Sequence, residues 1–393
     1  MIKYLQSFFN SPKATVFFFS FIVFTLPLKH NFNSLSIIFI SLFALGNFYF
    51  NRPRQVLQFT KGKMLTAFFV VTILGMIYTD NTKDGLQYLQ KMIPFLILPI
   101  AFNMLNLGKK QKSNILWSFC ISCLFVSLFL FFTNLYTFLY HPDNTNVWYY
   151  SGFTKRIDIH PAYYMMFLIF NTFFLLEEFL NTVSKRRKVG IISIVLVFLI
   201  PILFLQSRTG MVSFLVILLI YLSINLKKIK KRYLITIFVF ICISLSIVYY
   251  FDFLSRFLEA SSSMQERMMI WSGWWNSYKE NPIFGYGTGD AQNALDYGNY
   301  LLGNNFFIFY EYNSHNQYLD SLLRFGLIGF GILVVILIKG YRIAFKQTNN
   351  LLLIFLILVS IFFLTENVLQ RQRGIVFFSF FYLLLINFNS NEE

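Results

Sequence analysis

The segment Gln206-Ser207-Arg208-Thr209-Gly210 separates two long apolar runs, residues 191–205 and 211–226. Each run is close to the length of roughly 20 residues that an α-helix needs to cross a bilayer. The polar connection is too short to carry Arg208 far from the lipid, where an unpaired charge costs on the order of 3 kcal/mol or more. The stretch therefore predicts two membrane helices joined by a tight turn, with an arginine held at membrane depth.

The composition of the whole chain is that of a polytopic membrane protein. Of its 393 residues, 56% are hydrophobic, 20% aromatic and 13% charged, whereas soluble domains carry about 25% charged residues. The first apolar segment continues into Lys29-His30 without the small residues of a signal-peptide cleavage site, so we expect a membrane helix there.

Similar apolar segments recur along the chain and predict an all-α fold with about twelve transmembrane helices. The expected spans are residues 14–28, 34–50, 64–79, 92–107, 114–139, 161–181, 189–206, 209–226, 233–253, 318–338, 350–365 and 374–388. We expect one membrane domain over residues 1–393, with a long extracytoplasmic loop, residues 254–317, between the ninth and tenth helices.

The distribution of Lys and Arg predicts the orientation in the membrane. If the N-terminus lies inside, most of the 33 Lys and Arg residues fall on cytoplasmic segments, as the positive-inside rule requires. These segments are residues 3–13, 52–63, 109–112, 185–188, 227–232 and 339–346. We therefore expect both termini in the cytoplasm and the basic segments against anionic membrane lipids. The net charge of +16 needs no nucleic-acid partner, and none is expected.

No metal or other cofactor is expected. Cys120 and Cys123 have CxxC spacing but lie inside an apolar segment, where cysteine usually serves as a small packing residue. The carboxylates expected outside the membrane do not show the spacing of a metal site.

The long loop ends with Asn313-Ser314-His315-Asn316-Gln317, which contains one of only four histidines in the chain. An imidazole among hydrogen-bonding side chains at a membrane boundary is a candidate general base. The alternative is that His315 only caps the next helix, a role that Asn or Gln could fill.

Further arginines are expected on the outer side. Arg267 lies in Met264–Trp275, which predicts an amphipathic helix on the membrane surface with its tryptophans in the headgroup layer. Arg371 and Arg373 lie in an outer turn. A planar guanidinium suits bidentate recognition of phosphate, so these residues predict a site for a lipid-linked phosphate or pyrophosphate. The alternatives are a snorkelling role for Arg208 and a purely interfacial role for the Arg267 helix.

Two other segments carry polar signals. Residues 285–289 read GYGTG, but they follow no predicted strand, so dinucleotide binding is rejected. We expect a tight turn there, with amides that could approach an anion. His160 precedes Pro161 at the start of the sixth expected helix.

Three motifs resemble the O-antigen ligase superfamily, which includes related O-antigen polymerases. They are Ser207-Arg208-Thr209-Gly210, then Arg267 with Trp271 and the segment Asn281–Gly289, then His315-Asn316-Gln317-Tyr318-Leu319 with Gly326 and Gly329. Their order, the twelve-helix layout and the late long loop also fit that family.

This resemblance implies a metal-independent glycosyltransferase of the GT-C type in the bacterial inner (cytoplasmic) membrane. The donor would be a glycan on undecaprenyl pyrophosphate, and the acceptor a sugar hydroxyl of lipid A–core. By the family pattern, Arg208 and Arg267 would bind the pyrophosphate and His315 would deprotonate the acceptor. Ser314 stands where ligases often carry a further histidine, so acceptor recognition is expected to differ.

Three secondary residues and two other functions complete the expectations. Arg371 and Arg373 are further candidate donor contacts, and His160 is a candidate structural or acceptor-side residue. One alternative is a polymerase of the same superfamily, whose acceptor is a growing glycan. The other is a non-enzymatic transporter or flippase, which predicts ionisable residues near the membrane midplane; only Glu177 and Glu178 approach that position.

Overall fold

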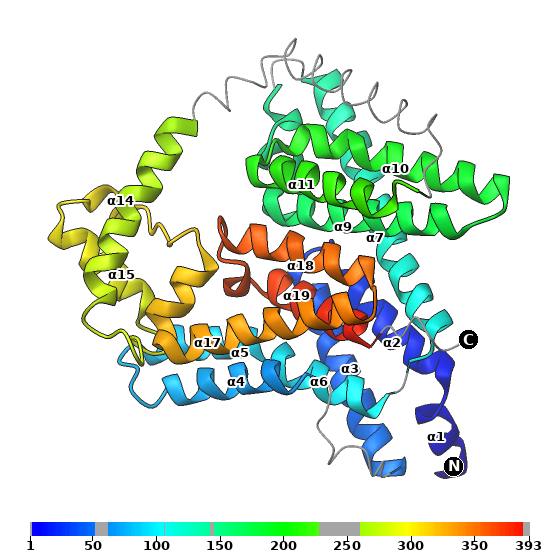
Figure 1. Cartoon of the computed structure of the whole chain (residues 1–393), viewed down its shortest axis with the longest axis horizontal. Coiled ribbons are helices and arrows are strands. Elements are labelled where there is room, and N and C mark those ends of the chain that lie inside the picture. Colours follow the sequence, from blue (N-terminus) through cyan, green and yellow to red (C-terminus); the bar gives the residue numbers. More distant parts are fainter. Residues whose placement is uncertain (1, 52–61, 106, 142–144, 228–259, 388–393) are drawn as a thin grey trace.

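The computed structural model describes residues 2–51, 62–105, 107–141, 145–227 and 260–387 (Figure 1). Every regular element in these ranges is a helix, so the all-α fold is confirmed for them. The longer helices are α1 (Ile2–Phe9), α2 (Pro12–Thr25), α3 (His30–Asn51), α4 (Lys63–Gly75), α5 (Thr82–Met92), α6 (Pro94–Met104), α7 (Lys109–Tyr140), α9 (Pro161–Asn181), α10 (Lys185–Leu205), α11 (Arg208–Asn225), α14 (Ala260–Tyr278), α15 (Ala291–Leu301), α16 (Asn305–Phe309), α17 (Gln317–Lys346), α18 (Asn350–Phe363) and α19 (Gln372–Ile386). Short helical turns are η2 (Thr145–Trp148), α8 (Ser151–Thr154), η3 (Lys155–Ile157) and η4 (Val368–Gln370).

Seven helical segments of the described residues are long and apolar enough to cross a membrane. They are Asn31–Phe50, Thr82–Met104, Lys109–Tyr140, Pro161–Asn181, Lys185–Leu205, Arg208–Asn225 and Gln317–Lys346. Four shorter apolar helices, α2, α4, α18 and α19, overlap further expected spans. The expected span 233–253 lies outside the described residues. A multi-pass membrane protein follows, while the count of twelve crossings stays a prediction.

Local signals in the sequence set several helix starts. Pro161 opens α9, the helix that coincides with the expected span 161–181, because proline at the first helical position loses no hydrogen bond. Ser207 caps α11 by accepting a hydrogen bond from the Gly210 amide at 3.3 Å, which satisfies one of the unpaired donors of the first turn.

The expected span 92–107 begins ten residues too late. The helical segment starts at Thr82, and α5 runs into α6 at Pro94. The first part carries charged residues and so lacks a strong apolar signal, yet it buries Gly85, Tyr88 and Met92. Its amphipathic pattern, rather than a continuous apolar run, marks it as part of the bundle.

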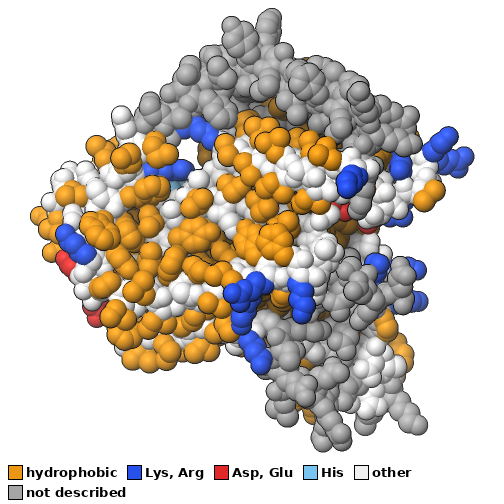
Figure 2. All heavy atoms as spheres, in the orientation of Figure 1, with side chains coloured by type: hydrophobic (Ala, Val, Ile, Leu, Met, Phe, Trp, Pro, Cys, Tyr) orange, Lys and Arg blue, Asp and Glu red, His pale blue; other side chains and the backbone are white. Residues whose placement is uncertain are grey.

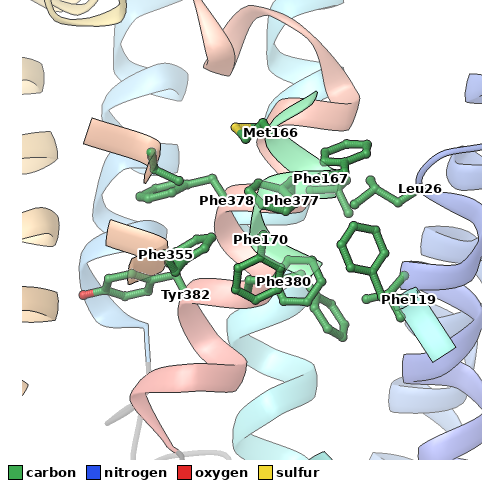
Figure 3. Close-up of a cluster of buried hydrophobic side chains, with 14 of the residues drawn as sticks. Leu26, Phe119, Met166, Phe167, Phe170, Phe355, Phe377, Phe378, Phe380 and Tyr382 are labelled. Atoms are coloured by element: carbon green, nitrogen blue, oxygen red, sulfur yellow. The ribbon is translucent and has the colours of Figure 1, made fainter. Parts of the chain in front are cut away.

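The core of the bundle is built from phenylalanine rings around α19 (Figure 3). Phe381 of α19 lies 4.9 Å from Phe119 of α7 and 4.7 Å from Phe170 of α9, measured between ring centroids. Every residue of α19 from 373 to 385 is buried. A helix that is apolar on all sides belongs in the interior of a bundle, and α19 is therefore the central helix.

Polar contacts distinguish the two ends of the bundle. At one end, which we call the basic end, Glu177 accepts a hydrogen bond from Asn350 at 3.3 Å, and Glu178 pairs with Arg187 at 2.7 Å. At the opposite end, the site end, the Tyr163 hydroxyl donates to the Asn367 carbonyl at 3.1 Å. Hydrophobic side chains cover much of the face drawn in Figure 2, and Lys and Arg gather at only a few places on it. The basic end is the predicted cytoplasmic end.

Residues 260–316 form a small helical layer against the N-terminal part of α17 (Figure 1). Ile270 and Trp274 of α14 and Leu295 of α15 belong to a separate apolar cluster there. The indole nitrogens of Trp271 and Trp274 donate to the carbonyls of residues 314 and 319, each at 2.9 Å. Of the three tryptophans expected in the headgroup layer, Trp274 thus fixes α14 to α17 and Trp271 fixes it to the segment just before α17, whereas Trp275 is 56% exposed. A membrane-surface position for α14 stays a prediction.

Candidate active site

His315 lies in a tight turn, residues 313–316, which we call the His315 turn. Its φ of +44° is in the left-handed region that residues other than glycine seldom adopt. The Asn313 side chain accepts the His315 amide at 2.9 Å, and Asn316 caps α17 by accepting the Tyr318 amide at 2.9 Å. Ser314 and Asn316 are buried, whereas His315 is only partly buried. The turn therefore leaves His315 more exposed than the two residues that flank it.

The charge state of His315 is set by burial and by two arginines. Burial, the largest cause, and the positive charges of Arg267 and Arg371 together lower the pKa of His315 to about 4. An imidazole with this pKa is neutral at pH 7, so it can accept a proton.

Arg267 of α14 and Glu366 lie beside this imidazole. The Arg267 guanidinium donates to the Thr365 carbonyl at 3.3 Å, which places it next to Glu366. Burial raises the pKa of Glu366 to about 7, against the opposing effect of Arg267 and Arg371. The site thus combines two arginines with a carboxyl group that is only partly ionised at pH 7.

His160 belongs to the same group of residues. It precedes Pro161 of α9, and its Nε2 lies 3.4 Å from the Tyr150 hydroxyl. Burial lowers its pKa to about 4, with smaller contributions from the charges of Arg371 and His315. Its Nδ1 is buried and has no hydrogen-bond partner in the described part of the chain. The structure therefore brings together both histidines that the sequence placed at helix starts.

The two arginines of the turn after α18 have different surroundings. Arg371 is exposed and acts electrostatically on both His160 and His315. Arg373 is buried and donates to three backbone carbonyls, those of residues 28, 157 and 158. A guanidinium that already has these acceptors holds three segments together at the site end, which favours a structural role over donor contact for Arg373.

Arg208 begins α11 at the same end of the bundle. Gly210 lies so close to α9 that an added Cβ would meet the Met165 sulfur at 2.4 Å, so the start of α11 is fixed beside the start of α9. The positive charges that act on His315 are those of Arg267 and Arg371. Arg208 therefore shares the end of the bundle with the other site residues, and its contact with a donor stays a prediction.

Comparison with known proteins supports the resemblance. Residues 192–334 match the family model described as O-antigen ligase. An uncharacterized protein of Haemophilus influenzae is 24% identical over 383 residues, covering 86% of this chain and 90% of that protein. All three motifs that carry the resemblance lie inside the O-antigen ligase match, which confirms it for this part of the chain. The match points to a membrane glycosyltransferase that uses lipid-linked glycans.

The match includes Arg208, Arg267 and His315 but ends before the turn that carries Glu366, Arg371 and Arg373. The residues around His315 thus come from two parts of the sequence. His160 comes from a third, upstream of the match. Only the folded chain shows that these parts meet.

The glycine-rich segment inside the match, residues 281–289, is a structural junction that we call the glycine turn. The amides of residues 285 to 289 donate to Asn281, Leu323, Arg324, Gly75 and Thr79 respectively. Since each amide is already paired, the expectation that these amides approach an anion is wrong. The turn instead joins α4, α14 and α17.

Arg324 lies behind the glycine turn and contributes to the same junction. It pairs with Asp320 at 3.3 Å, donates to the Thr288 carbonyl and stacks over the Tyr88 ring at 4.2 Å. Both members of the ion pair are almost fully buried. Arg324 therefore holds α5, α17 and the glycine turn together and has no surface open to a substrate.

Sequence reasoning gave no role to three residues near the site. Glu366 and Asn367 belong to the outer turn that the sequence marks by Arg371 and Arg373, but no pattern there indicates what they do. Lys91, near the end of α5, lies within electrostatic range of Arg371, but it comes from a segment that the hydropathy pattern left outside the membrane. Their place near the site depends on the packing of α5, α18 and α19, which local sequence does not encode.

No group of three or more His, Cys, Asp or Glu residues in the described ranges could hold a metal ion. Cys120 and Cys123 are free and buried within α7.

Proposed function

We propose that this protein is a membrane glycosyltransferase that moves a glycan from undecaprenyl pyrophosphate to an acceptor sugar hydroxyl, with lipid A–core as the acceptor. The reaction takes place at the periplasmic face of the bacterial inner membrane, with both termini in the cytoplasm. One observation carries the proposal, namely the neutral, partly exposed imidazole of His315 between the charges of Arg267 and Arg371.

Arg267 and Arg371 are the proposed primary contacts of the donor pyrophosphate, with Arg208 as a further contact. Planar guanidinium groups form bidentate hydrogen bonds with phosphate oxygens. Donors fixed where charge develops in the transition state supply electrostatic catalysis. These arginines stabilise the pyrophosphate as it leaves, without a metal ion in the proposed reaction.

His315 is the proposed general base. The acceptor oxygen attacks the anomeric carbon of the donor sugar, and the bond from that carbon to the pyrophosphate oxygen breaks. The electron pair of this bond leaves with the pyrophosphate, and the acceptor proton passes to the imidazole. A positioned base of this kind contributes about 10²–10⁴-fold to the rate.

Binding of the donor would also adjust the strength of the base. In the free protein, Arg267 and Arg371 lower the pKa of His315. Pyrophosphate carries negative charge, so it offsets these arginines and raises the His315 pKa towards neutrality. A stronger base then exists only when the donor is in place.

A polymerase that joins repeat units to one another would use the same residues. The products in a deletion strain separate the two reactions. Loss of all O-chain from core indicates a ligase, whereas core that carries a single repeat unit indicates a polymerase.

The direct experiment uses purified protein with an undecaprenyl-pyrophosphate-linked glycan and lipid A–core. We expect glycan on the core and release of undecaprenyl pyrophosphate. If an active preparation binds the donor but never transfers glycan to either acceptor, the enzyme proposal fails and a transporter becomes the better explanation.

A further inference from the structure

Asn367 occupies the centre of the site without belonging to any recognised motif. It lies in the segment between α18 and η4 and is only 3% exposed. Its backbone carbonyl accepts the Tyr163 hydroxyl at 3.1 Å, so α9 fixes its position from one side.

The side-chain oxygen of Asn367 binds both neighbours of His315. It accepts the Asn316 amide at 2.7 Å and the Ser314 hydroxyl at 3.2 Å. Because a backbone amide can only donate, the atom that faces it is the oxygen, and this fixes the orientation of the Asn367 amide. One side chain therefore holds the chain immediately before and immediately after His315.

The His315 turn needs such support. His315 has a φ of +44°, and this conformation persists in residues with a side chain only where the surroundings determine it. Trp271 and Asn313 hold the turn from the loop side. Trp271 donates to the Ser314 carbonyl at 2.9 Å, and the Asn313 side chain accepts the His315 amide at 2.9 Å. Two contacts join the turn to the segment after α18: the Asn313 side chain donates to Gln370 at 3.3 Å, and Asn367 binds the two residues that flank His315.

This segment also holds a cation. Arg267 donates to the carbonyl of Thr365, two residues before Asn367. Residues 365–367 therefore fix both the arginine and the turn that carries the imidazole. The distance between the Arg267 guanidinium and the His315 imidazole therefore depends on this short segment.

We propose that Asn367 is a positioning residue that sets the direction of the His315 imidazole relative to Arg267. This inference rests on the proposed function, since it assigns Asn367 a role in proton transfer to His315. The inference predicts that loss of the Asn367 side chain lowers turnover only when His315 is present.

The experiment is a double-mutant cycle on the purified full-length protein, read as glycan transferred per folded enzyme. Asn367→Ala should lower kcat by about 10- to 100-fold, the scale of a misplaced catalytic group. The KM for the undecaprenyl-pyrophosphate-linked donor should stay close to that of the parent. In a His315→Gln background, Asn367→Ala should cause no further loss.

The matched control is Asn225→Ala. Asn225 is 1% exposed and its side-chain amide donates to the Tyr221 carbonyl at 3.1 Å, at the end of α11 opposite Arg208. This variant should retain the parental kcat per folded enzyme. A kcat loss equal to that of Asn367→Ala would overturn the inference, because loss of any buried amide would then suffice.

Other outcomes separate the inference from the function on which it rests. If Asn367→Ala lowers the residual rate of His315→Gln by the same factor as in the parent, Asn367 acts independently and the inference fails. If the parent itself transfers no glycan, the proposed function fails instead. Should Asn367→Ala not fold, Ser314→Ala serves instead, because it removes only one of the two bonds to the Asn367 oxygen. A smaller loss of kcat that vanishes in the His315→Gln background supports the inference. A loss of kcat that persists in that background contradicts it.

Discussion

The His315 turn and the glycine turn meet α17 at different points and differ in what their polar groups do. In the glycine turn, each amide from residue 285 to 289 has a protein acceptor. In the His315 turn the amides of residues 315 and 316 are paired as well, but the imidazole is partly exposed beside two arginines. Both segments carry motifs of the same resemblance, yet one is built for packing and the other presents a reactive group. Within the described residues, the two turns differ in whether a polar group is left without a protein partner to meet a substrate.

The largest effect is expected from Gly326→Ala, at the junction of the glycine turn with α17. Gly326 has a φ of +60°, and an added Cβ would lie 2.1 Å from the Ile283 carbonyl oxygen. We expect destabilisation by more than about 3 kcal/mol and loss of folded protein. The measurement is the yield and thermal unfolding of detergent-solubilised protein. Gly331→Ala is the control, since nothing lies within 4 Å of its added Cβ; equal stability of the two variants would show that the positive φ and close approach of Gly326 are not required.

At the His315 turn the expected loss is of activity, with folding unchanged. His315→Gln keeps hydrogen bonding but cannot accept a proton near neutral pH. We expect normal membrane insertion and donor binding, with glycan transfer slower by at least about 10²-fold. The rate of transfer by the purified variant checks this. Near-parental transfer would leave His315 a structural role at the start of α17 and the arginines as the main catalytic groups.

Some features of both turns follow from local sequence, and others do not. Pro161 marked the start of α9 because proline acts on its own neighbourhood, and His315 stood out because polar residues surround it. Glu366 and Asn367 stood out only as members of the outer turn, because their contacts arise from the packing of α18 and α19 against α9 and α17. The glycine turn shows the converse, since GYGTG suggested an anion site and only the folded chain reveals that protein acceptors already occupy its amides.

Exchange of arginine for lysine tests the proposed donor contacts. Arg267→Lys and Arg208→Lys keep the charge but lose the planar fork, so we expect kcat/KM for the donor to fall by about tenfold or more. Arg187→Lys is the control, because Arg187 pairs with Glu178 at the basic end and should give the parental value. If Arg208→Lys transfers glycan as fast as the parent, Arg208 is a snorkelling residue and the pyrophosphate is bound by Arg267 and Arg371.

The smallest effect is expected in the pH dependence, where the prediction is a near absence of change. A base with the ordinary histidine pKa of about 6.5 would lose roughly tenfold in rate between pH 7.5 and pH 5.5. The pKa of His315 is lowered to about 4, so the neutral form persists as the pH falls. In the free protein, kcat/KM should therefore change by less than about twofold over that range.

Glu366 needs a separate control in this experiment, because its pKa is raised to about 7 and it titrates within the same range. The profile is best measured in Glu366→Gln, which retains a neutral side chain at every pH. An acid limb of kcat/KM near pH 6.5 in that variant would contradict the lowered pKa of the base. If donor binding offsets the two arginines, the acid limb of kcat should lie at a higher pH than that of kcat/KM, because kcat reports the donor-loaded enzyme. Coincident limbs would show that the arginines do not couple the donor to His315.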